Sequence, residues 1–270
     1  MPRRATFALA LTLALATGVA GWGPGATARA AKPAAEVLVF EAASLKEAFA
    51  ALAARFEKEH PGAHVVTNAA GSQELRAQLE QGAPADVFAS ADERHMQPLA
   101  AAGLATAPAL FACNEPVLVV RSGLGGVVKT FADLPRAERI VVGAPEVPIG
   151  AYTQQIWRNA GQKYGADFTA RVEARVVSRE TNVRQVLAKI VLGEADAGVV
   201  YRTDARSPTA QGKVSVVEIP RELNVTAAYP IAVLAAAPHP DLARAFVKLV
   251  RSPAGVAVLR EAGFVPCPSP

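Results

Sequence analysis

Short apolar runs alternate with longer amphipathic stretches along most of this chain. Apolar residues from Leu45 to Phe56 recur at helical spacing, and Pro61 and Gly62 end that helix. The same pattern predicts helices at 73–81, 93–102, 153–163, 183–192, 241–250 and 253–262, and strands at 37–40, 63–67, 86–89, 117–120, 140–142, 176–177 and 198–200. Repeated strand–helix units of this kind predict an α/β fold with mainly parallel sheets flanked by helices.

Two predicted strand-to-helix turns carry small residues and a serine, Ala42–Leu45 and Ala69–Ser72. Backbone N–H groups and the positive end of a helix dipole are free at such a turn, which suits an anion. Neither turn holds a lysine or arginine between its small residues and its serine. A site of this kind binds an ionised oxyanion with neutral donors.

The N-terminus has the pattern of an export signal at residues 1–30. A basic start at Arg3 and Arg4 precedes an uncharged run at 5–20, and Ala28-Arg29-Ala30 has the form of a signal-peptidase site. The alternative is a membrane anchor, but the run is shorter than the ~20 apolar residues that a spanning helix needs. We expect a cleaved signal and an exported, periplasmic protein that begins near Ala31.

Removal of residues 1–30 changes the charge balance. The whole chain has 28 basic and 24 acidic residues, and the signal contains three of the arginines and no acid. The remaining 240 residues are therefore nearly neutral, which gives no support for binding to nucleic acid. Their number suffices for one large or two medium domains.

Several segments resemble, in order and spacing, the periplasmic molybdate-binding proteins of ABC importers. The segments are Phe40–Leu45, Gly82–Asp92, Phe131–Leu134, Val147–Tyr152, Thr181–Arg184, Gly193–Ala205, Tyr229–Ile231 and Gly263-Phe264. The resemblance implies a two-lobed type II periplasmic-binding-protein fold with the ligand in the cleft between the lobes. It places lobe 1 at residues 31–113 plus 230–270 and lobe 2 at 114–229.

The resemblance also implies a ligand set drawn from both lobes. It consists of Ser44, Ser72, Ile149, Val183 and Tyr201. The serines would donate from hydroxyl and main-chain N–H groups, Ile149 and Val183 from the main chain alone, and Tyr201 from its phenol. Relatives often carry a small residue at the position of Ile149, and a serine rather than glycine at position 71.

The implied function is tight binding of molybdate or tungstate, as an oxyanion rather than a bare metal ion, and its delivery to the membrane permease of an ABC importer. The resemblance implies a monomer, with no cofactor and no nucleic-acid partner. A pocket of donors alone rejects an anion that keeps a proton, because an O–H would find no acceptor. A protein for another oxyanion, such as sulfate, on the same fold is the main alternative.

Each site residue also has an ordinary structural interpretation. Ser44 and Glu47 have the spacing of a capping box. Ser72 could simply begin a helix, and Tyr201 could be a core tyrosine with a satisfied hydroxyl. Arg184 is the candidate for recognition of a carboxylate ligand, but its place at a helix start favours a surface charge or one behind the site.

An enzyme is a weaker hypothesis for this sequence. It contains no Gly-x-Ser-x-Gly elbow, His-Glu-x-x-His motif or Walker loop. Pro61 and Gly62 separate His60 from His64, so that the two cannot share a helix face. Four aspartates could be imagined as metal ligands, but turn or cap positions explain them better, namely Asp86, Asp92, Asp196 and Asp204. No repeat favours a structural or adhesive role.

Cys113 and Cys267 are the two cysteines of the chain. An oxidising compartment permits one disulfide, but two buried thiols are an equal alternative from the residues alone. The resemblance places Cys113 where the chain leaves the first lobe and Cys267 where it ends against that lobe. It therefore favours a disulfide between them, with hinges near 113–114 and 229–230.

Overall fold

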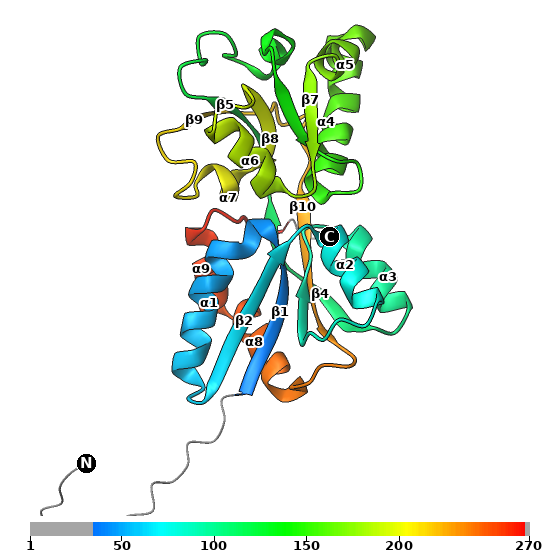
Figure 1. The fold of residues 1–270 in the computed structure, drawn as a ribbon, viewed down its shortest axis with the longest axis vertical. Coiled ribbons are helices and arrows are strands. Elements are labelled where there is room, and N and C mark those ends of the chain that lie inside the picture. Colours follow the sequence, from blue (N-terminus) through cyan, green and yellow to red (C-terminus); the bar gives the residue numbers. More distant parts are fainter. Residues whose placement is uncertain (1–34, 268–270) are drawn as a thin grey trace, which may run out of the picture. The chain divides into compact units, whose positions relative to one another are not determined.

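The computed structural model describes residues 35–267, which form two five-stranded sheets. The first sheet has the strand order β2-β1-β3-β10-β4 and the second β7-β6-β8-β5-β9 (Figure 1). The strands of the first are β1 (Ala35–Ala42), β2 (Ala63–Ala70), β3 (Val87–Ala89), β4 (Ala105–Asn114) and β10 (Ala227–Leu234). Those of the second are β5 (Pro116–Arg121), β6 (Ile140–Gly143), β7 (Val176–Glu180), β8 (Ala197–Tyr201) and β9 (Val214–Val217).

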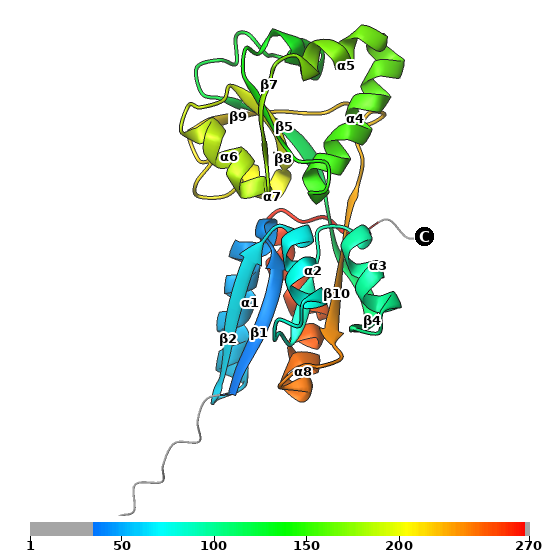
Figure 2. The same cartoon turned by 45° about the vertical axis from the view of Figure 1, so that its right-hand side comes forward.

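Helices cover both faces of the first sheet (Figure 2). They are α1 (Lys46–Glu59), α2 (Ser72–Glu80), α3 (Glu93–Ala101), α8 (Pro240–Arg251) and α9 (Pro253–Glu261), and a 3-10 turn, η1 (Ala43–Leu45), precedes α1. Val37 and Val39 of β1 belong to the core that contains α1, α8 and α9, whereas Phe40 packs with α2 and α3. The alternation of strand side chains thus gives the sheet two buried faces.

The second sheet has its own helices. They are α4 (Pro148–Tyr164), α5 (Ala166–Glu173), α6 (Val183–Val191) and the short α7 (Arg202–Ala205), with a 3-10 segment, η2 (Phe131–Arg136). Trp157 of α4 and Leu187 of α6 are both buried in the core. Each sheet with its helices is one lobe, so the predicted two-lobed α/β fold is confirmed.

The sheets are mixed, since each has two parallel and two antiparallel pairings. The parallel pairings join β1, β2 and β3 in one sheet and β6, β7 and β8 in the other, as the strand–helix alternation predicts. The antiparallel pairings involve β4, β5, β9 and β10. The apolar pattern alone does not predict three of these strands, β4, β9 and β10, although the family resemblance implies two crossover strands between the lobes. The alanine-rich sequence of β4 has weak strand propensity, so its long-range pairing with β10 determines its conformation.

Two segments connect the lobes, and both belong to paired strands of the first sheet, β4 and β10. Only Glu115 separates β4 from β5, and Ala227 at the start of β10 pairs with Asn114 at the end of β4. The ladder of the first sheet therefore includes residues on both sides of the expected hinges. The limits of the two lobes stay a prediction, and the expected signal at 1–30 lies outside the described residues.

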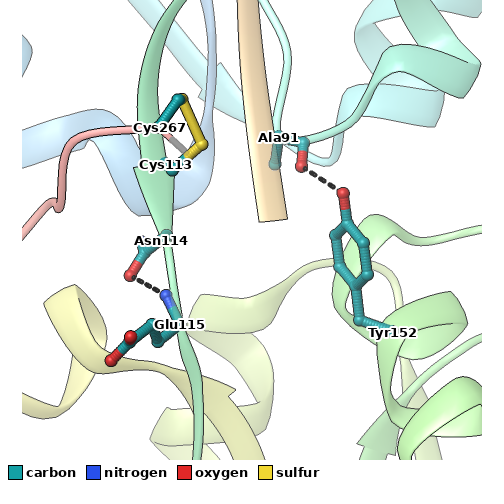
Figure 3. Close-up of a disulfide and its surroundings, with 6 residues drawn as sticks. All are labelled: Ala91, Cys113, Asn114, Glu115, Tyr152 and Cys267. Carbon is teal, nitrogen blue, oxygen red and sulfur yellow. Dashed lines mark hydrogen bonds between the residues drawn. A yellow bond between two sulfur atoms is a disulfide. The ribbon is translucent and has the colours of Figure 1, made fainter. Parts of the chain in front are cut away.

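A disulfide joins Cys113 of β4 to Cys267 near the C-terminus (Figure 3). Backbone hydrogen bonds between Cys113 and Val265 hold the same two segments together, at N···O distances of 3.0 and 2.8 Å. The structure therefore contains the disulfide that the resemblance implied. No helix within residues 35–267 is both long and apolar enough to cross a membrane.

Candidate functional site

One small cavity brings together all five predicted ligand residues. Its walls are formed by Ala42, Ala43, Ser44, Ala70, Gly71, Ser72, Ala91, Val147, Pro148, Ile149, Asn182, Val183 and Tyr201. These residues come from both lobes. The cavity has a volume of only about 10 Å³. This is about the space that one water molecule needs.

Three helices begin at this cavity. Ser72 and Val183 are the first residues of α2 and α6, and Ile149 is the second residue of α4. The N–H groups of a helix's first turn have no acceptor within the helix. The start of α4 also lacks a side-chain cap. These termini therefore supply main-chain donors and partial positive charge without a cationic side chain.

Pro148 and Gly150 explain how Ile149 is placed. Pro148 occupies the first position of α4, where its missing N–H costs no hydrogen bond. A Cβ on Gly150 would lie 2.0 Å from the carbonyl oxygen of Ala144, so only glycine lets the first turn of α4 pack this closely. The Ile149 side chain is 1 % exposed. Its apolar side chain therefore anchors the turn, and only the backbone N–H is left for a ligand.

The hydroxyl of Ser72 is oriented by the neighbouring loop. Its Oγ accepts a hydrogen bond from the N–H of Ala91, at an N···O distance of 3.0 Å. Because that contact uses an oxygen lone pair, the hydroxyl proton stays available for an acceptor in the cavity. Ser72 also begins α2, as its ordinary interpretation stated. The helix start and the ligand position are therefore compatible.

A chain of hydrogen bonds orients Ser44. The Oδ1 of Asn114 accepts from the Glu115 N–H at 3.0 Å (Figure 3), so its amide nitrogen is the donor, 3.5 Å from Tyr229 Oη. Tyr229 Oη lies 2.9 Å from Ser44 Oγ. Either hydroxyl can be the donor in this contact. When Tyr229 donates, the Ser44 proton is free for an acceptor in the cavity.

The capping-box interpretation of Ser44 is wrong. Neither η1 nor α1 has a side-chain cap, and the hydroxyl of Ser44 bonds to Tyr229 instead. Glu47, the expected partner in the box, pairs with Arg184. Tyr229 and Arg184 are the partners of Ser44 and Glu47, and both lie far along the chain. A local sequence motif does not reveal such partners.

Tyr201 presents a polar atom that lacks a partner. Its ring is 1 % exposed, and its Oη is buried without a hydrogen-bond partner among the described residues. Burial raises the pKa of this phenol, so the group stays protonated and acts as a donor. Tyr229 and Tyr152 pack edge-on against the ring, at centroid distances of 5.8 and 6.4 Å. A buried donor of this kind stays costly until an acceptor reaches it.

Arg184 lies just behind the cavity without lining it. Its guanidinium contacts Glu47, the carbonyl of Ala43 and the carboxylate of Asp204. Burial raises the pKa of Asp204 to about 6, and its Oδ2 accepts the Tyr201 N–H at 3.1 Å. Among residues 35–267, no charged side chain lines the cavity itself.

The four aspartates that the sequence analysis weighed as metal ligands have hydrogen-bond or ion-pair partners in the protein. Asp92 caps α3 through the N–H of His95. Asp86 accepts the N–H groups of Leu38 and His239, and Asp196 binds Arg121 and Arg139. Asp204 caps the N–H of Tyr201 at the start of α7. The cap interpretation is therefore confirmed for Asp92 and Asp204, while Asp86 and Asp196 join segments that are distant in the sequence.

Sequence reasoning did not find Asn114 and Tyr229 as parts of the site. Both are buried at 0 % exposure, and both lie on the paired crossover strands β4 and β10. In the sequence, the one indication of such a role is a polar side chain beside apolar residues. Since Tyr229 meets Ser44 across 185 positions of sequence, that indication does not name its partner.

Two α/β lobes with a small, donor-lined cavity between them define a class of protein that binds a solute rather than a polymer. The chain belongs to the family of bacterial extracellular solute-binding proteins, whose sequence profile matches residues 37–265. It is 42 % identical over 230 residues to the molybdate-binding protein ModA of Mycobacterium tuberculosis, which covers 84 % of each chain.

Solved structures share the fold at lower identity. The periplasmic molybdate-binding protein of Azotobacter vinelandii superposes with a TM-score of 0.74 at 24 % identity, over 86 % of this chain and 100 % of that one. The sulfate-binding protein SubI of Mycobacterium tuberculosis reaches a TM-score of 0.77 at 20 % identity, over 86 % of this chain and 87 % of that one.

Proposed function

We propose that this protein binds molybdate or tungstate outside the cytoplasm and delivers the anion to the membrane permease of an ABC importer. The ligand donors in this proposal are Ser44, Ser72, Ile149, Val183 and Tyr201. The single observation that carries it is the uncharged cavity, whose lining combines three helix starts and two serines with a buried tyrosine hydroxyl that has no hydrogen-bond partner within residues 35–267. The 42 % identity to a molybdate-binding protein supports the choice of ligand.

Energies favour a dianion in such a cavity. A hydrogen bond to a charged group contributes about 1.5–3 kcal/mol, so seven donors, namely three hydroxyl and four main-chain N–H groups, supply roughly 10–20 kcal/mol before the costs of desolvation and closure. Tight binding needs a net value of about −10 to −12 kcal/mol. Neutral donors can therefore hold the anion, and the absence of a fixed cation leaves it able to depart.

The donor set also indicates what the site rejects. Monohydrogen phosphate carries an O–H that needs an acceptor, and the proposed ligand groups are all donors. Sulfate has no such proton and must be rejected by size, because its shorter bonds leave some donors out of reach. Molybdate and tungstate are nearly equal in size, so we propose the pair.

Sulfate is the second candidate ligand. The fold is shared with a sulfate-binding protein at a TM-score of 0.77, and a fully deprotonated sulfate satisfies the same donors in kind. We further propose that the protein performs no chemistry on its ligand, needs no cofactor and acts as a monomer. Membership of an extracellular family supports a location outside the cytoplasm.

Tyr201→Phe should weaken the binding of molybdate by about 10- to 100-fold, the equivalent of one charge-assisted hydrogen bond. The anion-free variant should be at least as stable as the native protein, because the lost hydroxyl has no partner among the described residues. Isothermal titration calorimetry and thermal unfolding measure the two quantities. Tyr164→Phe, at the far end of α4, is the control. An unchanged affinity for molybdate would remove Tyr201 from the ligand set.

A further inference from the structure

Arg184 contacts both lobes at once. Within its own lobe, its Nε lies 2.9 Å from Oδ1 of Asp204, which is completely buried. In the first lobe, the carbonyl oxygen of Ala43 accepts from the same nitrogen at 3.2 Å. The two terminal nitrogens of Arg184 bind the two carboxylate oxygens of Glu47 on α1. The arginine side chain is only 19 % exposed.

The contact with Glu47 depends on how the lobes are placed. A planar guanidinium and a carboxylate form two parallel hydrogen bonds only in one relative orientation. Arg184 is fixed to the second lobe by α6 and Asp204, and Glu47 is fixed to the first by α1. Movement of the lobes apart would therefore break the pair, while Asp204 would remain a partner for Arg184.

Neutral contacts cross the same gap on other sides of the cavity. The side-chain amide of Gln73 donates to the carbonyl of Thr181 at 2.6 Å, and Nε2 of His95 donates to the carbonyl of Glu146 at 2.9 Å. A Cβ at Gly71 would lie 2.4 Å from the Thr181 carbonyl oxygen. The lobes thus meet closely around the cavity, and Arg184–Glu47 is an ionic contact between them.

We propose that Arg184 and Glu47 form a clamp that holds the lobes closed over a bound anion and sets how fast the anion leaves. The inference rests on the proposed function. Arg184 does not line the cavity, and protein acceptors engage its N–H groups, so it is a positioning residue rather than a ligand. It acts through the balance of open and closed states, since release requires opening.

The size of the effect follows from the exposure of the two partners. Glu47 is 42 % exposed, so solvent weakens the pair, but Arg184 is mostly shielded and the contact is bidentate. We expect the rate of dissociation to rise about three- to tenfold when Glu47 loses its charge, between the values for exposed and for charge-assisted pairs. The rate of association should not fall, because the open state is the one that receives the anion and loss of the clamp favours that state.

The test compares Glu47→Gln with Glu59→Gln by stopped-flow kinetics with molybdate. Both glutamates lie on α1 and pair with an arginine, but the partner of Glu59 is Arg55 on the same helix. Faster dissociation for Glu47→Gln alone, with association no slower than in the native protein and unchanged thermal stability, supports the clamp. Equal dissociation rates for the two variants would overturn it.

Small-angle scattering tests the clamp hypothesis separately from the proposed function. If the native protein binds neither molybdate nor tungstate, the proposed function is wrong, and the anion-free proteins then decide the clamp. In that case Glu47→Gln should have a larger radius of gyration than Glu59→Gln. Identical radii for the native protein and both variants would overturn the clamp independently of any ligand.

Discussion

Replacement of Ser44 and Ser72 by alanine in one protein should weaken molybdate binding by about 100- to 10,000-fold, since each hydroxyl provides one charge-assisted hydrogen bond of about 1.5–3 kcal/mol. The Ser72 hydroxyl accepts from the Ala91 N–H, which leaves its proton free, and the Ser44 hydroxyl lies 2.9 Å from that of Tyr229. Both serines bind the same anion, so the stated range is the simple sum of the two contributions, and comparison with the two single variants measures their coupling.

Calorimetric titration of the double variant measures this loss. A matched control replaces Ser122 and Ser178, two serines of the second lobe that do not line the cavity, and it should bind like the native protein. Thermal unfolding must accompany the titration, because Ser44→Ala removes the hydrogen-bond partner that Ser44 provides to the Tyr229 hydroxyl. A folded double variant with native affinity would show that the ligand assignment is wrong.

Glu41→Gln should stabilise the protein by about 4–5 kcal/mol at pH 8 and above, with little effect at pH 4. Glu41 lies on β1 at 0 % exposure, and both carboxylate oxygens are buried without a partner among the described residues. Burial, reinforced by the charge of Glu47, raises its pKa from 4.5 to about 8. The unfolded chain therefore releases this proton at a lower pH than the folded protein does.

The sign of the pH dependence follows from that difference. Below pH 4.5 both states are protonated, and the native protein loses none of its stability at this site. As the pH rises from 4.5 to about 8, ionisation of this group in the unfolded chain lowers the free energy of unfolding. Above a pH of about 8 this loss of stability is complete. Glutamine cannot ionise, so its advantage should grow over that window.

Urea unfolding of both proteins at pH 4, 6 and 8 measures the advantage of the glutamine variant. Glu36→Gln, at an exposed position of the same strand, is the control. A difference between Glu41→Gln and the native protein that does not change with pH would contradict the assignment of a neutral buried carboxyl.

Local patterns predicted the helices and parallel strands but not the strands that cross between the lobes. The helix at 46–59 follows from apolar spacing and its Pro-Gly stop, and the structure has it there. Helix α4 begins at Pro148, five residues before the predicted start, because Val147–Gly150 resembles a turn in isolation. Its first turn depends on the contact between Gly150 and Ala144, which only the folded chain provides.

The site shows the same division between local and long-range information. Strand-to-helix turns with a serine predicted donors at Ser44 and Ser72, and the structure brings them to one cavity with Ile149, Val183 and Tyr201. What the sequence could not provide is the orientation of each hydroxyl. The Ser44 hydroxyl is placed by Tyr229, 185 positions further along the chain, and the Ser72 hydroxyl by the N–H of Ala91.

Calorimetry of the purified native protein with molybdate, tungstate, sulfate and phosphate in turn tests the proposed function most directly. Molybdate and tungstate should each bind one per chain with a Kd below about 1 μM. Sulfate and phosphate should bind far more weakly, sulfate because of its size and phosphate because of its proton. Tight sulfate binding with no heat from molybdate or tungstate would contradict the proposed function.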